Sequence, residues 1–260
     1  MQPGLAETLR VATWHVELER DGPGLLLRDI LKGEDSDIDA TVRTIAHLSP
    51  DILLLTGFDW DLQGTALKAL ADRVAEHGPG YPHLFSRRPN SGRPTGLDLD
   101  GDARRGGPRD AQGYGRFSGH GGMALLSRLP VDVVGMRDFS DMLWADFPGN
   151  LLNGANPPLY RWPQAAAAQR LPSVGHWDVP VILPGGARLH LLAFAAGPPV
   201  FDGPEDRNGK RNHDEVAFWT RYLSGGLAAT PPDAPVVVLG HPILDPVDGE
   251  GILGAIHGLL

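Results

Sequence analysis

The stretch PVVVLGHPILDP (residues 235–246) decides the prediction of the fold. Its first half is rich in β-branched residues and ends at Gly240, a pattern typical of a buried strand that runs into a turn. His241 is the first side chain after that glycine. Strand ends of this kind hold functional groups in α/β proteins, because the sheet fixes the backbone while the loop exposes the side chain. We therefore expect His241 to belong to a functional site.

Strand and helix patterns alternate along the rest of the chain. Strands are expected over residues 9–16, 51–56, 122–128, 180–183 and 188–194, and helices over 39–48, 62–76, 212–223 and 252–260. Residues 81–121 are rich in Gly, Pro, Arg and Asp and lack periodicity, which predicts a long loop insertion. No repeat or linker interrupts the pattern, so residues 1–260 are predicted to form a single α/β domain.

Composition narrows the class of protein. The net charge of −9 opposes tight non-specific binding to DNA, RNA or anionic lipid, so neither a nucleic acid nor a membrane is indicated as a partner. The chain has no cysteine, which excludes disulfides, thiolate zinc sites and a cysteine nucleophile. No apolar run approaches the ~20 residues of a membrane span. Residues 1–8 lack the apolar core of a signal peptide, and the compartment stays open.

Five separate stretches resemble a bacterial branch of the endonuclease/exonuclease/phosphatase superfamily. They are VATWHVE (11–17), PDILLL (50–55), GHGGMALLSR (119–128), GHWDVP (175–180) and the stretch over 236–246. The resemblance implies a DNase I-like fold, a two-sheet α/β sandwich flanked by helices with the active site at one end of the sheets. It also implies descent from a metal-dependent phosphoester hydrolase that uses Mg²⁺ or Mn²⁺. Relatives in this branch often look exported.

The motifs that carry the family's chemistry are substituted in this chain. The family's "WN" is Trp14-His15, its metal-binding glutamate is replaced at Thr56-Gly57, its "GDxN" turn reads GHPI (240–243), and Ala195 stands where a histidine often lies near the phosphate. Magnesium needs oxygen ligands and carboxylate charge. A general acid or base contributes typically ~10² to 10⁴-fold to the rate. These substitutions predict a pseudoenzyme whose family activity is weak or lost.

Two alternatives remain open. In the first, the chain is an active phosphomonoesterase or phosphodiesterase with a rebuilt site of His15, His241, Asp59 and His176, because imidazoles bind Zn²⁺ well and Mg²⁺ poorly. Its substrate would be a phosphorylated small molecule or a phosphodiester. In the second, the chain is a non-catalytic binding protein that uses the old cleft. The histidines would then fill space beside it.

The acidic sequence DLDGDA (98–103) resembles the start of a calcium-binding loop. Alternating carboxylates at Asp98, Asp100 and Asp102 can converge on one cation when the loop curls around it. The sixth place is Ala103 instead of glycine, and the twelfth is an arginine followed by Asp110 as the remaining carboxylate. The sequence therefore permits either a structural calcium site or an ordinary solvated acidic loop.

Basic residues near residue 210 suggest a place for a phosphate. Arg207, Arg211 and His213 lie where a helix is expected to begin, and free N–H groups at helix amino termini favour anions. His120 precedes the strand expected over 122–128, where relatives place residues that face the substrate.

The helix start itself has a second interpretation. Asn212 followed by Glu215 fits a capping box, in which the two side chains and backbone N–H groups satisfy each other.

The carboxyl end of the sequence suggests how copies of the chain could associate. The family closes with an aspartate–histidine pair on a late strand, whereas this sequence stops at Leu260. A sandwich that lacks its last strands leaves a sheet edge open to pairing with another chain. Self-association through such an edge is predicted.

Overall fold

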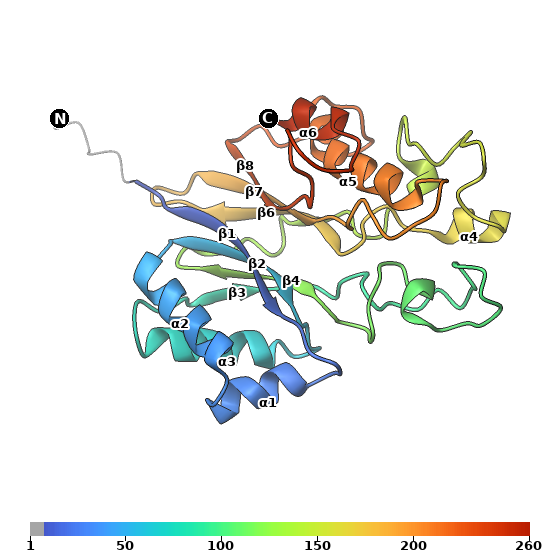
Figure 1. The fold of residues 1–260 in the computed structure, drawn as a ribbon. Coiled ribbons are helices and arrows are strands. Elements are labelled where there is room, and N and C mark those ends of the chain that lie inside the picture. The colour runs from blue at the N-terminus through green and yellow to red at the C-terminus, as the bar shows by residue number, and fades with distance from the viewer. Residues whose placement is uncertain (1–7) are drawn as a thin grey trace.

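Two four-stranded sheets pack face to face in the computed structural model, which describes residues 8–260 (Figure 1). The first sheet has the order β1-β2-β4-β3, with β1 at Val11–Leu18, β2 at Ile52–Phe58, β4 at Gly122–Ser127 and β3 at His83–Phe85. The second has the order β5-β6-β7-β8, with β5 at Arg137–Asp138, β6 at Gly175–Ile182, β7 at Arg188–Ala195 and β8 at Val236–His241. The predicted two-sheet sandwich is confirmed.

Helices cover the outer faces of the two sheets (Figure 1). On the first sheet lie α1 (Leu25–Lys32), α2 (Ser36–Leu48) and α3 (Thr65–Ala75), and on the second lie α5 (Arg207–Leu223) and α6 (Gly254–Leu259). One apolar cluster lies between the sheets, and one lies under the helices of each sheet. Because β2 is covered on both faces, all of its residues are buried, as its unbroken apolar run predicts.

The predicted insertion is an ordered excursion at one end of the sandwich. It contains β3 at its start and the 3₁₀ turn η1 (Pro108–Asp110), so residues 81–121 are not loop throughout. The chain folds back on itself through isolated bridges that pair Ser91 with Gly113 and Pro94 with Ala111. A second excursion, with η2 (Trp144–Asp146) and α4 (Pro163–Ala168), lies at the same end (Figure 1).

The capping box predicted at Asn212 and Glu215 is wrong. Helix α5 begins at Arg207, so both residues lie inside the helix, and both are fully buried. Asn212 Nδ2 donates to the carbonyl oxygens of Gly197 at 2.7 Å and Pro242 at 2.8 Å. The earlier start was missed because the first turn of α5 is polar and half-exposed, a stretch in which apolar periodicity carries no signal.

Two further expectations concern edges and membranes. β8 lies at the edge of its sheet, so self-association through this edge stays a prediction.

Among residues 8–260, no helix is both long and apolar enough to span a bilayer. The prediction that residues 1–8 are not a signal peptide concerns residues that, except for residue 8, lie outside the described range.

Candidate functional site

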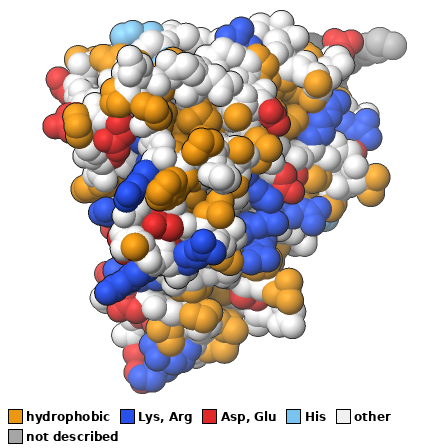
Figure 2. Space-filling model, turned by 90° about the vertical axis from the view of Figure 1, so that its right-hand side faces the viewer, with side chains coloured by type: hydrophobic (Ala, Val, Ile, Leu, Met, Phe, Trp, Pro, Cys, Tyr) orange, Lys and Arg blue, Asp and Glu red, His pale blue; other side chains and the backbone are white. Residues whose placement is uncertain are grey.

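A cleft of about 540 Å³ opens at the end of the sandwich where the two excursions lie. Strands contribute His15, Thr56, Ala195 and His241 to its lining. Gly57 of β2 also lines it, and loops and helix α5 supply the charged side chains Glu19, Arg109, His120, Arg207, Arg211 and Glu215. Figure 2 looks onto this end of the molecule and shows Lys and Arg side chains across the middle of the face, with hydrophobic side chains between them. The lining of the cleft holds three arginines against two glutamates, on a protein of net charge −9.

Two histidines meet at the strand ends. His15 on β1 and His241, the last residue of β8, have ring centroids 4.3 Å apart. His15 Nδ1 and Thr56 Oγ1 are hydrogen-bonded at 3.0 Å. Burial, reinforced by the neighbouring His15, lowers the pKa of His241, so this imidazole is held neutral at neutral pH. The structure thus brings together two of the four residues predicted as catalytic.

Gly57 makes room for this pair. It has a φ of 68°, and a Cβ at this position would lie 2.6 Å from His15 Cε1. The imidazole therefore occupies the space that a side chain at position 57 would need. The imidazole at position 15 and the absence of a side chain at position 57 therefore depend on each other in this structure.

Asp59 holds the strand ends together beside the cleft. Its buried carboxylate accepts hydrogen bonds from the backbone N–H of Arg20 at 2.7 Å and of Gly121 at 2.9 Å. Burial raises its pKa, although both N–H donors favour the charged form. The side chain does not line the cleft, so its contacts are those of a structural residue.

Glu19 is a carboxylate of the cleft that the sequence reasoning missed. It follows the end of β1, and its Oε2 lies 3.7 Å from Nε2 of His120. Both side chains line the cleft, and contact of His120 with a substrate stays a prediction. The strand predicted over residues 9–16 ends three residues before Glu19, whereas β1 extends to Leu18, so the prediction did not place Glu19 at the strand end.

His176 lies in the core instead of the cleft. It sits on the face of β6 that α5 covers, and its ring packs against Phe218 and Trp219. Its Nε2 is 2.8 Å from the backbone oxygen of Glu215. Burial lowers the pKa of His176 to about 4. Side chains alternate between the two faces of β6, and His176 lies on the face covered by α5. It therefore does not belong to the cleft as predicted.

The three basic residues expected at a phosphate have different surroundings. Arg207 lines the cleft, stacks on Tyr160 at 5.1 Å and donates to the carbonyl oxygen of Leu99 at 3.1 Å. Arg211 also reaches the cleft, but its guanidinium is engaged by backbone carbonyls, those of Leu171, Gln112 and Arg170. His213 is hydrogen-bonded to Asp214 at 2.9 Å and does not line the cleft.

Glu215 is the second acidic residue of the cleft. Its carboxylate is fully buried and accepts hydrogen bonds from the backbone N–H of Gly197 at 2.8 Å, and from both the backbone N–H and the hydroxyl of Ser173. Burial raises the pKa of Glu215 to about 7, against the opposing effect of Arg211. Sequence reasoning assigned this residue to a helix cap, so its role in the cleft was missed.

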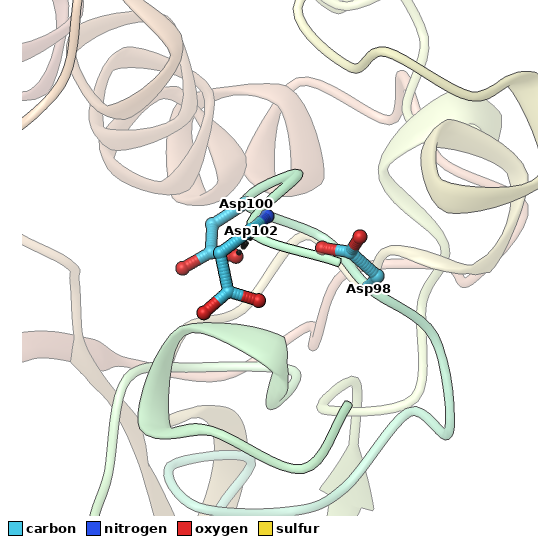
Figure 3. Close-up of side chains that lie close together, drawn as sticks. All are labelled: Asp98, Asp100 and Asp102. Carbon is cyan, nitrogen blue, oxygen red and sulfur yellow. Dashed lines mark hydrogen bonds between the residues drawn. The ribbon is translucent and has the colours of Figure 1, made fainter. Parts of the chain in front are cut away.

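The acidic loop lies apart from these groups. Carboxylate oxygens of Asp98, Asp100 and Asp102 lie within 4.8 Å of one another (Figure 3). Asp110 does not join them, because its buried carboxylate accepts hydrogen bonds from the backbone N–H of Leu99 at 2.8 Å and Gly107 at 3.0 Å. Within residues 8–260 this is the only group of three or more side chains placed to hold a metal, and both interpretations of the loop, a calcium site and a solvated acidic loop, stay open.

Comparisons with known proteins place the chain in a family. The model of the "Endonuclease/Exonuclease/phosphatase family" matches residues 30–240. A comparison with curated proteins gives no match. An endonuclease/exonuclease/phosphatase from Beutenbergia cavernae is 16% identical with a TM-score of 0.51, over 93% of this chain and 48% of that one. Sphingomyelinase C from Streptomyces griseocarneus is 16% identical with a TM-score of 0.50, over 98% of this chain and 69% of that one.

A third similar structure holds a metal. Beta toxin from Staphylococcus aureus with bound magnesium ions is 12% identical with a TM-score of 0.47, over 97% of this chain and 69% of that one. This chain spans about half the length of the Beutenbergia protein. The match to the family model extends over most of the sequence, from the end of α1 to β8. The chain belongs to the endonuclease/exonuclease/phosphatase family.

Proposed function

We propose that this protein binds a phosphate-bearing small ligand in the cleft and has weak or no metal-dependent phosphoester hydrolysis. The observation that carries the proposal is the contact between His15 and His241 at the strand ends, with ring centroids 4.3 Å apart. These are the positions where the family resemblance implies an asparagine and an aspartate.

The donor set of the cleft does not fit a magnesium site. Members of the family generally depend on a divalent metal. Magnesium prefers oxygen ligands in octahedral geometry, whereas this strand end offers two imidazoles and the hydroxyl of Thr56. The two carboxylates of the cleft are otherwise engaged, Glu19 beside His120 and Glu215 on Ser173 and Gly197. We therefore assign no hydrolytic step to this ion.

The charge of the cleft favours an anion. Arg109, Arg207 and Arg211 line it, and Arg109 is exposed. A neutral His241 can donate one N–H to a phosphate oxygen without the desolvation cost of a second charge. Guanidinium groups suit phosphate because their N–H groups match its geometry.

A second candidate function keeps catalysis. The His15–His241 contact and the Glu19–His120 contact lie in the same cleft, and nitrogen ligands suit Zn²⁺. In this case a zinc ion would take the two imidazoles as its protein ligands, and the substrate would supply a further ligand.

One experiment separates the two functions. Hydrolysis of p-nitrophenyl phosphate and bis-p-nitrophenyl phosphate would be followed with Mg²⁺, Mn²⁺, Ca²⁺ and Zn²⁺, in parallel with calorimetric binding of inorganic phosphate without metal. The variants are His241→Ala and, as a matched control, His47→Ala on the exposed surface of α2. We expect no metal-dependent turnover and saturable phosphate binding that only His241→Ala weakens.

Other outcomes discriminate. Turnover with Zn²⁺ or Mn²⁺ that His241→Ala abolishes and His47→Ala preserves would establish the second candidate. Neither turnover nor phosphate binding, from protein with a cooperative unfolding transition, would overturn both.

A further inference from the structure

The cleft is larger than a phosphate group. Its volume of about 540 Å³ lies within the range of roughly 300–1,000 Å³ that is usual for sites of drug-sized ligands. The strand end with His15 and His241 forms only one part of the lining. The other part comes from the insertion and from the segment that leads into α5, and this outer part would contact whatever group the phosphate carries.

Aromatic side chains distinguish the outer part. Tyr114 from the insertion is 61% exposed, Phe201 from the segment between β7 and α5 is 79% exposed, and both line the cleft. Beside them, Leu99 and Tyr160 provide a buried apolar floor. Exposed rings at the mouth of a cleft leave apolar surface in water that a flat ligand group can cover.

Phe201 is held in an unusual backbone conformation. Its φ is 71°, in the left-handed region that bulky side chains rarely adopt. Such conformations persist only where the surrounding structure imposes them, and they cluster at ligand sites. The neighbouring segment is tied down, since Asn208 Nδ2 donates to the carbonyl oxygen of Val200 at 2.7 Å. The backbone conformation therefore fixes the position of the Phe201 ring at the mouth of the cleft.

Arginines line the same cleft as these rings. Arg207 stacks over the ring of Tyr160 at 5.1 Å and lines the same cleft, as does the exposed Arg109. A ligand that joins a negative group to a flat apolar group would match both features at once. A polyol phosphate would leave the rings hydrated.

We propose that Tyr114 and Phe201 bind the aromatic group of an aryl phosphoester, which makes aryl phosphates the preferred ligand class of the cleft. This proposal rests on the proposed function for the binding of the phosphate itself. The aromatic group lies against the two rings of the rim while the phosphate faces the basic part of the lining.

The test compares three ligands that differ in one feature each. Dissociation constants of inorganic phosphate, methyl phosphate and phenyl phosphate would be measured by calorimetry with a chelator present. The proteins are the wild type, the double variant Tyr114→Ala/Phe201→Ala, and the control Trp162→Ala, which removes an exposed aromatic side chain that does not line the cleft. Circular dichroism melting checks that each variant is folded.

We expect phenyl phosphate to bind the wild type about tenfold or more tightly than methyl phosphate, since stacking on aromatic side chains has this magnitude. The double variant should lose that preference and keep its affinity for inorganic phosphate, whereas Trp162→Ala should keep both. Equal binding of phenyl and methyl phosphate by the wild type would overturn the aryl preference and leave the proposed function standing. If no phosphate species binds the folded wild type, the proposed function itself fails.

Discussion

Helices α2 and α5 cover opposite sheets of the same sandwich, yet they bury different chemistry. Of the buried residues of α2, all but Thr41 are apolar, namely Ile38, Val42 and Ile45. Helix α5 buries Asn212, Asp214 and Glu215 next to its aromatic residues. Each of these polar groups holds a loop that borders the cleft or the second excursion. The comparison teaches that α2 only packs against a hydrophobic core, whereas α5 also fixes the loops around the cleft.

The largest effect is expected where α5 holds the second excursion. Asp214 is buried and accepts hydrogen bonds from Trp144 Nε1 and from the backbone N–H of Leu151, both at 2.7 Å. Asp214→Ala leaves these donors without an acceptor, so we expect a loss of about 3 kcal/mol or more in the free energy of unfolding. Urea denaturation would measure it. The matched change in α2, Ile45→Val, should cost only about 1 kcal/mol. Equal losses would remove the distinction between the two helices.

A second prediction uses two buried groups that titrate in opposite senses. The pKa of Glu215 is raised to about 7, so its folded-state contribution is present below pH ~4.5 and is lost as pH rises through ~7. The pKa of His176 is lowered to about 4, so its contribution is present above pH ~6.5 and is lost as pH falls through ~4. Each amounts to about 3 kcal/mol, and the two slopes oppose each other between pH 4.5 and 6.5.

Single variants should separate these slopes. In Glu215→Gln, the free energy of unfolding should rise with pH from about 4 to 6.5, because, of this pair, only the contribution of His176 remains. In His176→Gln it should fall from about pH 4.5 to 7, because only Glu215 remains. Urea denaturation across this range checks both signs. Parallel pH profiles of the two variants would contradict the assignment.

A smaller effect is expected from the coupled positions at the strand ends. Gly57→Ala adds a Cβ that would lie 2.6 Å from His15 Cε1, at a φ of 68°. We expect a loss of about 2 kcal/mol, part from the clash and part from the backbone conformation. In a His15→Ala background the clash is absent and the loss should be about half as large. A double-mutant cycle by thermal denaturation measures this coupling, and additive losses would show that the two positions are independent.

The smallest effect is expected at the acidic loop. Asp100 and Asp102 are exposed, and their side chains accept hydrogen bonds from the backbone N–H groups of Asp102 and Arg104 within the same loop. Exposed positions of this kind change stability by about 0.5 kcal/mol or less. We expect Asp100→Asn and millimolar Ca²⁺ each to leave the melting temperature nearly unchanged. A rise of several degrees with Ca²⁺, absent in Asp100→Asn, would instead establish a calcium site.

Much of the framework could be predicted because it depends on local patterns. The apolar run of β2, the alternation of β1 and the helical spacing of α2 and α3 all report one-sided or two-sided burial. Of the predicted side chains that line the cleft, His15 and His241 lie on that framework, whereas His120, Arg207 and Arg211 come from a loop and from α5. His176 was wrongly assigned to the site. The packing of α5 decides which face of β6 is covered, and the sequence of β6 alone does not show this.

By itself, the sequence determined the family, the two-sheet sandwich and the presence of histidines in place of the family's oxygen ligands. These follow from residue types along single strands and turns. Only the tertiary structure decided that His15 fills the space beside Gly57, that Glu19 meets His120, and that Glu215 lies buried in the cleft. These contacts join segments that are far apart along the chain. Their geometry depends on how the sheets and helices pack together, which no local pattern of residues encodes.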